Sequence, residues 1–124
     1  MFSVDGYNIR LHRGDTGAMK VKANATLNGQ TFTFGENDRA VFSIKNGQGD
    51  VVKEKYAQMT NNEFIVYFLN ADTDNLAPGP GYSWDVRYVI NPYYDSDGRI
   101  VDGDQVLTPK DPMPMNLLTV VGDI

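Results

Sequence analysis

The chain has 124 residues, of which 41% are hydrophobic and 22% charged, and its formal net charge is −5. This length and composition are typical of one globular domain with a hydrophobic core. The negative charge argues against nucleic acid as a partner, because such partners are bound by clustered Lys and Arg. The absence of cysteine excludes disulfide scaffolds, thiolate zinc sites and cysteine nucleophiles.

The N-terminal stretch "MFSVDGYNIRLHRGD" has an aspartate at position 5 and no long apolar run, so no secretory signal is expected. The longest apolar run, "FIVYFL" at 64–69, is far shorter than a membrane span. We therefore expect a soluble chain that is made in a cytoplasm.

In the first half of the chain the apolar residues recur with a period of two, which indicates half-buried strands. An Asn-Gly pair at 28–29 predicts a hairpin turn, and "NGQGD" at 46–50 predicts another. "EFIVYFL" is apolar on both faces, which predicts a central strand covered on each side. The expected strands lie at 7–12, 17–27, 31–34, 39–45, 51–59 and 63–69.

In the second half, "NADTDNLAPGPG" at 70–81 predicts a break with one helical turn, after which the prolines exclude regular structure. "YSWDVRYVI" at 82–90 is the clearest strand, and further strands follow "NPYYDSDGR", the last near 113–121. Eight or nine short strands predict one all-β domain over 1–124, an antiparallel sandwich or barrel with a long hairpin near the C-terminus.

The order of residues in "DTDNLAPGPGYSW" favours an immunoglobulin-like sandwich. An acidic turn, a tyrosine and a bulky core residue two positions later are typical of a tyrosine corner, in which the hydroxyl bonds to upstream backbone. Tyr82 would be the corner residue, and Trp84 would pack in the core.

"DSDGRIVDGD" at 95–104 raises the question of calcium, because Asp-rich loops bind this ion. An EF-hand needs ligands at positions 1, 3 and 5 and an acid at 12, but counting from Asp95 places Arg99 at position 5 and Val106 at position 12. "SDGR" is better explained as a hairpin turn, and "DGD" as a second turn or a bulge. No metal site is therefore predicted, and the weak calcium candidates are Asp95, Asp97, Asp102 and Asp104.

Catalytic patterns are sparse. The single histidine, His12, has no nucleophile motif nearby, and no "GxSxG" elbow occurs. The carboxylates Asp38, Glu63 and Asp85 could serve a glycosidase only if the fold brought two of them together, and solvated or capping roles are favoured. "RGD" at 13–15 is interpreted as a turn, not as an adhesion motif.

The aromatic residues suggest both core and surface. Trp84 and Tyr88 share one strand face and are expected in the core. Tyr93 and Tyr94 are adjacent in a predicted turn, so at least one of them should be exposed and available to a protein or a glycan.

Four stretches together, "IRLHRGDTG", "DRAVFSIKNGQGDVVKEK", "TDNLAPGPGYSWDVRYVI" and "VLTPKDPMPMNLLTVVGDI", resemble small phage and prophage proteins of Gram-positive gut bacteria. "RGDTG" with the later "LAPGPGYSWDV" is also similar to the N-terminal domain of phage baseplate upper proteins. That resemblance implies a β-sandwich with a structural, non-enzymatic role in a tail or baseplate. Two departures from the family are expected: the downstream segments of a baseplate upper protein would be absent, and the long "NPYYDSDGRIVDGD" hairpin would be added.

We therefore expect a non-enzymatic virion part without catalytic residues or cofactors, resident in the host cytoplasm before assembly. Other virion proteins are the expected partners, while a homo-oligomer and a host-surface glycan remain open. A head decoration or fibre protein is the rival within the structural class. A carbohydrate-binding module, with or without calcium, is the alternative from another class, and a small glycosidase ranks third. The predicted contact residues are Tyr93, Tyr94, Asp95, Asp97 and Arg99.

Overall fold

The computed structural model describes residues 3–5, 8–108 and 117–121. These residues form eleven strands and a single helical turn, which confirms the all-β prediction. The first strands are β1 (Ser3–Asp5), β2 (Asn8–His12), β3 (Gly17–Lys22), β4 (Thr26–Leu27), β5 (Gln30–Thr31) and β6 (Arg39–Lys45). They are followed by β7 (Val51–Gln58), β8 (Glu63–Phe68), α1 (Asn70–Thr73), β9 (Gly79–Tyr94), β10 (Ile100–Leu107) and β11 (Leu117–Val121).

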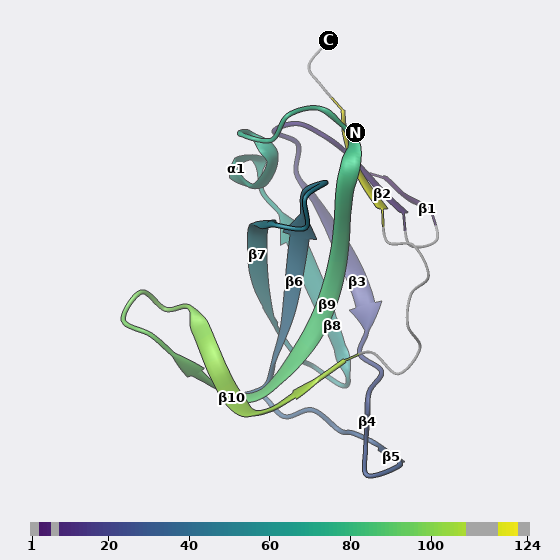
Figure 1. The fold of residues 1–124 in the computed structure, drawn as a ribbon. Helices are drawn as coiled ribbons and strands as arrows, with labels where there is room; N and C mark the ends of the chain where they lie inside the picture. Colours follow the sequence, from purple (N-terminus) through teal and green to yellow (C-terminus); the bar gives the residue numbers. More distant parts are fainter. Residues whose placement is uncertain (1–2, 6–7, 109–116, 122–124) are drawn as a thin grey trace.

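Most strands belong to one seven-stranded sheet, in the order β1-β2-β11-β9-β6-β7, with β10 also paired to β9. β3 and β8 form a second, two-stranded sheet, and β4 and β5 form a small hairpin (Figure 1). The expectation of a wholly antiparallel arrangement is wrong in one place, since β11 pairs with β2 in parallel. A parallel pair needs a long connection, and here nearly the whole chain lies between the two strands.

The hydrophobic core lies between the seven-stranded sheet and the β3–β8 pair. Phe42 of β6 stacks on Trp84 of β9 with ring centroids 5.3 Å apart, and it meets Phe68 of β8 edge-on at 5.6 Å. Aromatic pairs with these geometries stabilise a core beyond the area that they bury. The expected core positions of Trp84 and Tyr88 are confirmed, since both side chains are buried.

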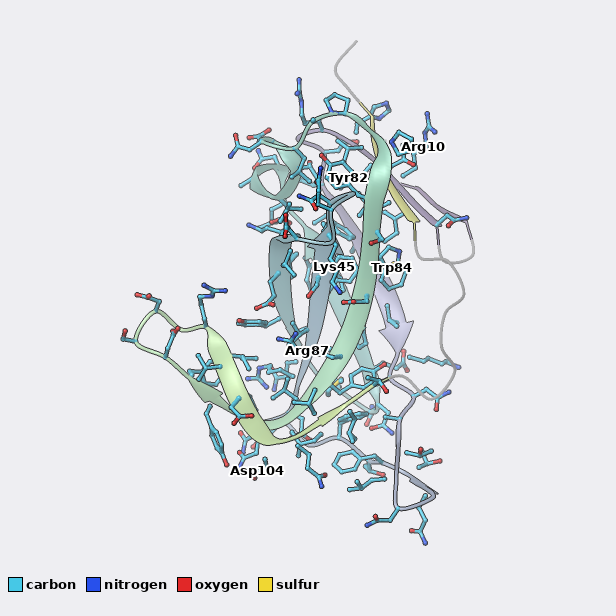
Figure 2. All side chains as sticks on the ribbon, in the orientation of Figure 1. Arg10, Lys45, Tyr82, Trp84, Arg87 and Asp104 are labelled. Atoms are coloured by element: carbon cyan, nitrogen blue, oxygen red, sulfur yellow. The ribbon has the colours of Figure 1, made fainter. Side chains whose placement is uncertain are left out.

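The predicted hydrogen bond of the tyrosine corner is present. The Tyr82 hydroxyl donates to the Ala77 carbonyl at 2.8 Å, and Trp84 is buried two residues later. Figure 2 labels both side chains on β9. The immunoglobulin-like arrangement of the whole domain stays a prediction.

β9 is longer than the predicted strand at 82–90 and extends over 79–94. The expectation that the prolines exclude regular structure is therefore wrong for Gly79–Gly81, which belong to β9. Gly79 pairs with Val120 of β11 across a register shift between Leu118 and Val120. Proline lacks the backbone donor that a regular ladder needs, and an irregular edge tolerates this loss.

The predicted strand at 31–34 is wrong beyond Thr31. Instead of strand pairing, the Asn62 side chain accepts from the Phe34 N–H at 2.9 Å and donates to the Phe32 carbonyl at 3.1 Å. A side-chain amide can replace backbone partners in this way. The Asn-Gly turn is confirmed, since Asn28 and Gly29 both have positive φ between β4 and β5.

The prediction that 63–69 is a central strand is also wrong. Among the described residues, β8 pairs with no strand other than β3. One face of β8 is buried in the core, whereas Ile65, Tyr67 and, just beyond the strand, Leu69 are exposed.

The helical turn α1 confirms the predicted turn after β8 and carries a buried carboxylate. Asp72 receives hydrogen bonds from Lys55 Nζ at 2.6 Å and from the Leu69 N–H at 2.8 Å, and Lys53 Nζ lies 3.4 Å away. Burial alone would raise the pKa of Asp72, but the Leu69 N–H and the two lysines outweigh it and lower that pKa. This cluster ties α1 to β7.

Candidate functional site: the β9–β10 hairpin

The end of β9 and the strand β10 form a hairpin that projects from the body of the molecule (Figure 1). The prediction of a turn at "NPYY" is wrong, because these four residues continue β9. Tyr94 is opposite Ile100, Tyr93 is opposite Asp102, and a bulge falls between Ile100 and Asp102.

The loop at the tip of the hairpin is organised by one aspartate. The Asp95 carboxylate accepts from the N–H groups of Asp97 at 2.9 Å and Arg99 at 3.0 Å. The Asp95 N–H donates to the Arg99 carbonyl at 2.9 Å, and Gly98 has a φ of +77°. The predicted turn at "SDGR" is confirmed, since aspartate and a positive-φ glycine supply what a tight turn needs.

Tyr93 and Tyr94 are both about half exposed, and as neighbours in a strand they point to opposite faces. The Tyr93 hydroxyl donates to the Asp104 carboxylate, which also accepts from Asn91 Nδ2 at 3.0 Å. The hydrogen bond that Tyr93 donates to Asp104 raises the pKa of Tyr93, and the same bond together with the Asn91 amide lowers the pKa of Asp104. Because Tyr93 and Tyr94 point to opposite faces of the strand, their rings do not form one stacking platform.

Three of the four aspartates considered for calcium are engaged separately. Asp95 holds the loop, Asp104 holds Tyr93 and Asn91, and Asp102 accepts from the Gly103 N–H at 2.8 Å. In the part of the chain that the structure describes, no three His, Asp or Glu side chains lie close enough together to hold a metal ion.

The hairpin is anchored to the outer face of the seven-stranded sheet. Ile100 packs with Val41 and Val89 in a small second core. Its N–H donates to the Tyr56 hydroxyl at 2.9 Å, and Tyr56 donates to Glu54 at 2.8 Å. Burial is the main cause that raises the pKa of Tyr56.

At Gly103 a Cβ atom would overlap a methyl group of Val89 and approach the Ile90 carbonyl, so only glycine fits at this point of β10. The root of the hairpin is thus held by packing as well as by hydrogen bonds. Its free surfaces carry four exposed apolar side chains, Tyr93, Tyr94, Val101 and Val106.

The carboxylates considered for glycosidase chemistry have structural partners. Asp38 accepts from the N–H groups of Gly35 at 2.7 Å and Asn91 at 3.0 Å. Glu63 pairs with Lys20 at 3.0 Å, and Asp85 pairs with Lys45 at 2.7 Å. The partners of these three carboxylates lie on different elements. One of them, Lys45, is labelled in the body of the sheet in Figure 2, whereas Asp104 is labelled in the hairpin.

The "RGD" tripeptide lies in the turn between β2 and β3. The Asp15 N–H donates to the His12 carbonyl at 2.9 Å, and Gly14 has a φ of +81°. The Gly14 N–H donates to the Thr73 hydroxyl at 2.9 Å, which docks the turn on α1. The predicted turn is confirmed.

Sequence reasoning missed a groove of about 510 Å³ between β7 and β8, adjoined by a hollow of about 180 Å³. Both are lined by Tyr56, Ala57, Ile65 and Tyr67. The signal was present in the run "FIVYFL", whose second apolar face was expected to be covered.

No helix among the described residues has the length and apolar character that a membrane crossing requires. No protein-family model, curated protein or solved structure matches the chain. The function is therefore argued from the chain's own residues.

Proposed function

We propose that this protein is a non-enzymatic structural or accessory part of a phage particle, in the tail or baseplate, and that the β9–β10 hairpin is its contact with neighbouring virion proteins. The observation that carries the proposal is the projecting, anchored hairpin with four exposed apolar side chains. The resemblance to baseplate upper proteins supports the type of particle.

Exposed aromatic and aliphatic side chains on a pre-organised element are suited to protein contacts, because little conformational entropy is lost on binding. Tyr94 and Val101 provide apolar area. The adjacent Asp97 and Arg99 belong to the exposed tip, where charges contribute orientation and specificity more than affinity.

The contact between the β9–β10 hairpin and other virion proteins can be tested in particles purified from a producing host. The wild-type chain should co-sediment with the particles at a constant ratio. A Tyr94→Ala, Val101→Asp double variant should be lost from them, because both exposed apolar contacts are removed. The control Val51→Asp also changes an exposed apolar residue, but on β7, and should be retained.

Absence of the wild-type chain from the particles would refute a virion part, and equal retention of both variants would refute the hairpin contact. Binding of the purified chain to an immobilised glycan panel, lost in Tyr94→Ala, would instead favour the carbohydrate-binding alternative. The opposite orientations of Tyr93 and Tyr94 make this outcome the less expected one.

A further inference from the structure

One edge of β8 faces the groove beside β7, and no strand of the described residues pairs along it. Among the described residues β8 pairs with β3 on one side only, and beyond the bridge between Thr60 and Glu63 it diverges from β7. Tyr67 is 58% exposed and Leu69 is 55% exposed. An edge strand presents unpaired N–H and C=O groups that can pair with another strand.

The β8 edge lacks the features that keep edge strands apart. Natural edges are commonly blocked by charged side chains or proline, and the longer outer strands β3, β7 and β10 do carry charges. β8 has a single charge, Glu63, at its first residue, and the following "FIVYFL" contains neither proline nor glycine. The charges on the other strands are Lys20 and Lys22 on β3, Lys53, Glu54 and Lys55 on β7, and Asp102 and Asp104 on β10.

We propose that a second copy of this chain pairs with the first through β8, antiparallel and about a two-fold axis at Val66. The two β3–β8 sheets then join into one four-stranded sheet. This proposal does not depend on the hairpin contact, and either can fail without the other.

The position of the axis follows from the side chains. Residues directly opposite each other in an antiparallel pair share a face, so an axis at Val66 places Ile65 against Tyr67 of the partner on the outer face. Such aromatic and β-branched pairs are favourable. An axis at Ile65 would instead place Glu63 against Tyr67.

The charges are compatible with this pairing. The two-fold axis at Val66 puts the two Glu63 side chains at opposite ends of the paired segment, roughly 20 Å apart at about 3.4 Å per residue. Each Glu63 keeps its own partner, Lys20 of β3 at 3.0 Å. No like charges therefore meet along the paired edge, and the overall charge of −5 is not concentrated there.

Light scattering after size exclusion, over a range of protein concentrations, tests the pairing. We expect twice the chain mass of 13.8 kDa for the wild type and the single-chain mass for Tyr67→Lys. Val106→Lys changes an exposed apolar residue of β10 and should stay dimeric. Circular dichroism of each variant verifies that the fold is kept. A wild type that is monomeric at every concentration, or a dimeric Tyr67→Lys, overturns the proposal.

Disulfide cross-linking tests the axis, because the natural chain has no cysteine. Ile65→Cys and Tyr67→Cys, mixed in equal amounts and oxidised, should form a covalent dimer, since directly opposite residues lie within disulfide reach. Each variant alone should not, because its two cysteines are offset along the strands. Cross-linking of one variant alone as efficiently as the mixture overturns the assigned axis.

Discussion

Replacement of Asp72 by asparagine removes the charge of the carboxylate but keeps its shape. In the folded protein this carboxylate is buried and accepts from Lys55 Nζ at 2.6 Å and the Leu69 N–H at 2.8 Å, with Lys53 Nζ at 3.4 Å. A hydrogen bond between charged groups contributes about 1.5–3 kcal/mol. The Lys53 contact is longer and more exposed, so it contributes less.

We therefore expect Asp72→Asn to lower the free energy of unfolding by about 2–3 kcal/mol at neutral pH. The Leu69 N–H can still donate to the asparagine oxygen. Asp72→Ala also removes that acceptor and should cost about 1 kcal/mol more. Urea denaturation measures both, and the midpoint should fall while the slope stays constant.

The dependence on pH follows from the lowered pKa of Asp72 in the folded state. A carboxyl with a lowered pKa stabilises the fold at pH values above its unfolded pKa of about 4, and this contribution is lost as the pH falls through the folded pKa. The difference between wild type and Asp72→Asn should therefore be constant near neutrality and shrink on acidification below about pH 4.

Asp85→Asn is the matched control, because Asp85 also pairs with a lysine, Lys45 at 2.7 Å, but both side chains are more than a third exposed. Such surface pairs contribute less than about 1 kcal/mol. Equal destabilisation by Asp72→Asn and Asp85→Asn would refute the argument that burial gives the Asp72 cluster its strength. If the difference in stability between wild type and Asp72→Asn persists unchanged in acid, the stabilisation by the Asp72 cluster is not electrostatic.

Four further outcomes are expected. Tyr82→Phe loses the corner hydrogen bond and should lower stability by about 1 kcal/mol in thermal or urea unfolding; an unchanged midpoint would mean that water replaces this bond. Gly103→Ala should cost about 1–3 kcal/mol because the added methyl group overlaps a valine of β9, whereas Gly81→Ala, with open space around it, should cost far less. In spectrophotometric titration, the difference between wild type and Tyr93→Phe should show a tyrosine with a raised pKa, and Asp104→Asn should shift that pKa downwards. Millimolar calcium should leave the melting temperature unchanged, because the hairpin aspartates do not converge and only a ligand of the folded state raises it; a clear rise would show a calcium site.

The amino-acid sequence by itself determined the features that depend on neighbouring residues. Alternation with a period of two indicates strands wherever one face is buried, and it located β2 and the middle of β9. β6, β7 and β8 were predicted within a few residues as short runs between turns. Turns follow from the few residue types that accept positive φ, so the pairs Asn28-Gly29 and Asp97-Gly98 predicted their hairpins. The tyrosine corner was also predictable, because Tyr82 and its acceptor are five residues apart.

The exposed contact residues were partly predictable as well. Two adjacent large aromatic side chains cannot easily share one buried face, and Tyr93 and Tyr94 are both exposed. Their opposite orientations were missed, because the segment was taken as a turn, whereas pairing with β10 continues the strand through it.

Only the tertiary structure decided which strands are neighbours. Backbone hydrogen bonds between strands leave no signature in the side chains, so the parallel pairing of β2 with β11 was not predicted. For the same reason the second apolar face of β8 was expected to be covered, although its side chains Ile65 and Tyr67 are exposed. The cluster of Asp72 with Lys53 and Lys55 likewise depends on α1 meeting β7, a contact between segments that only the folded chain brings together.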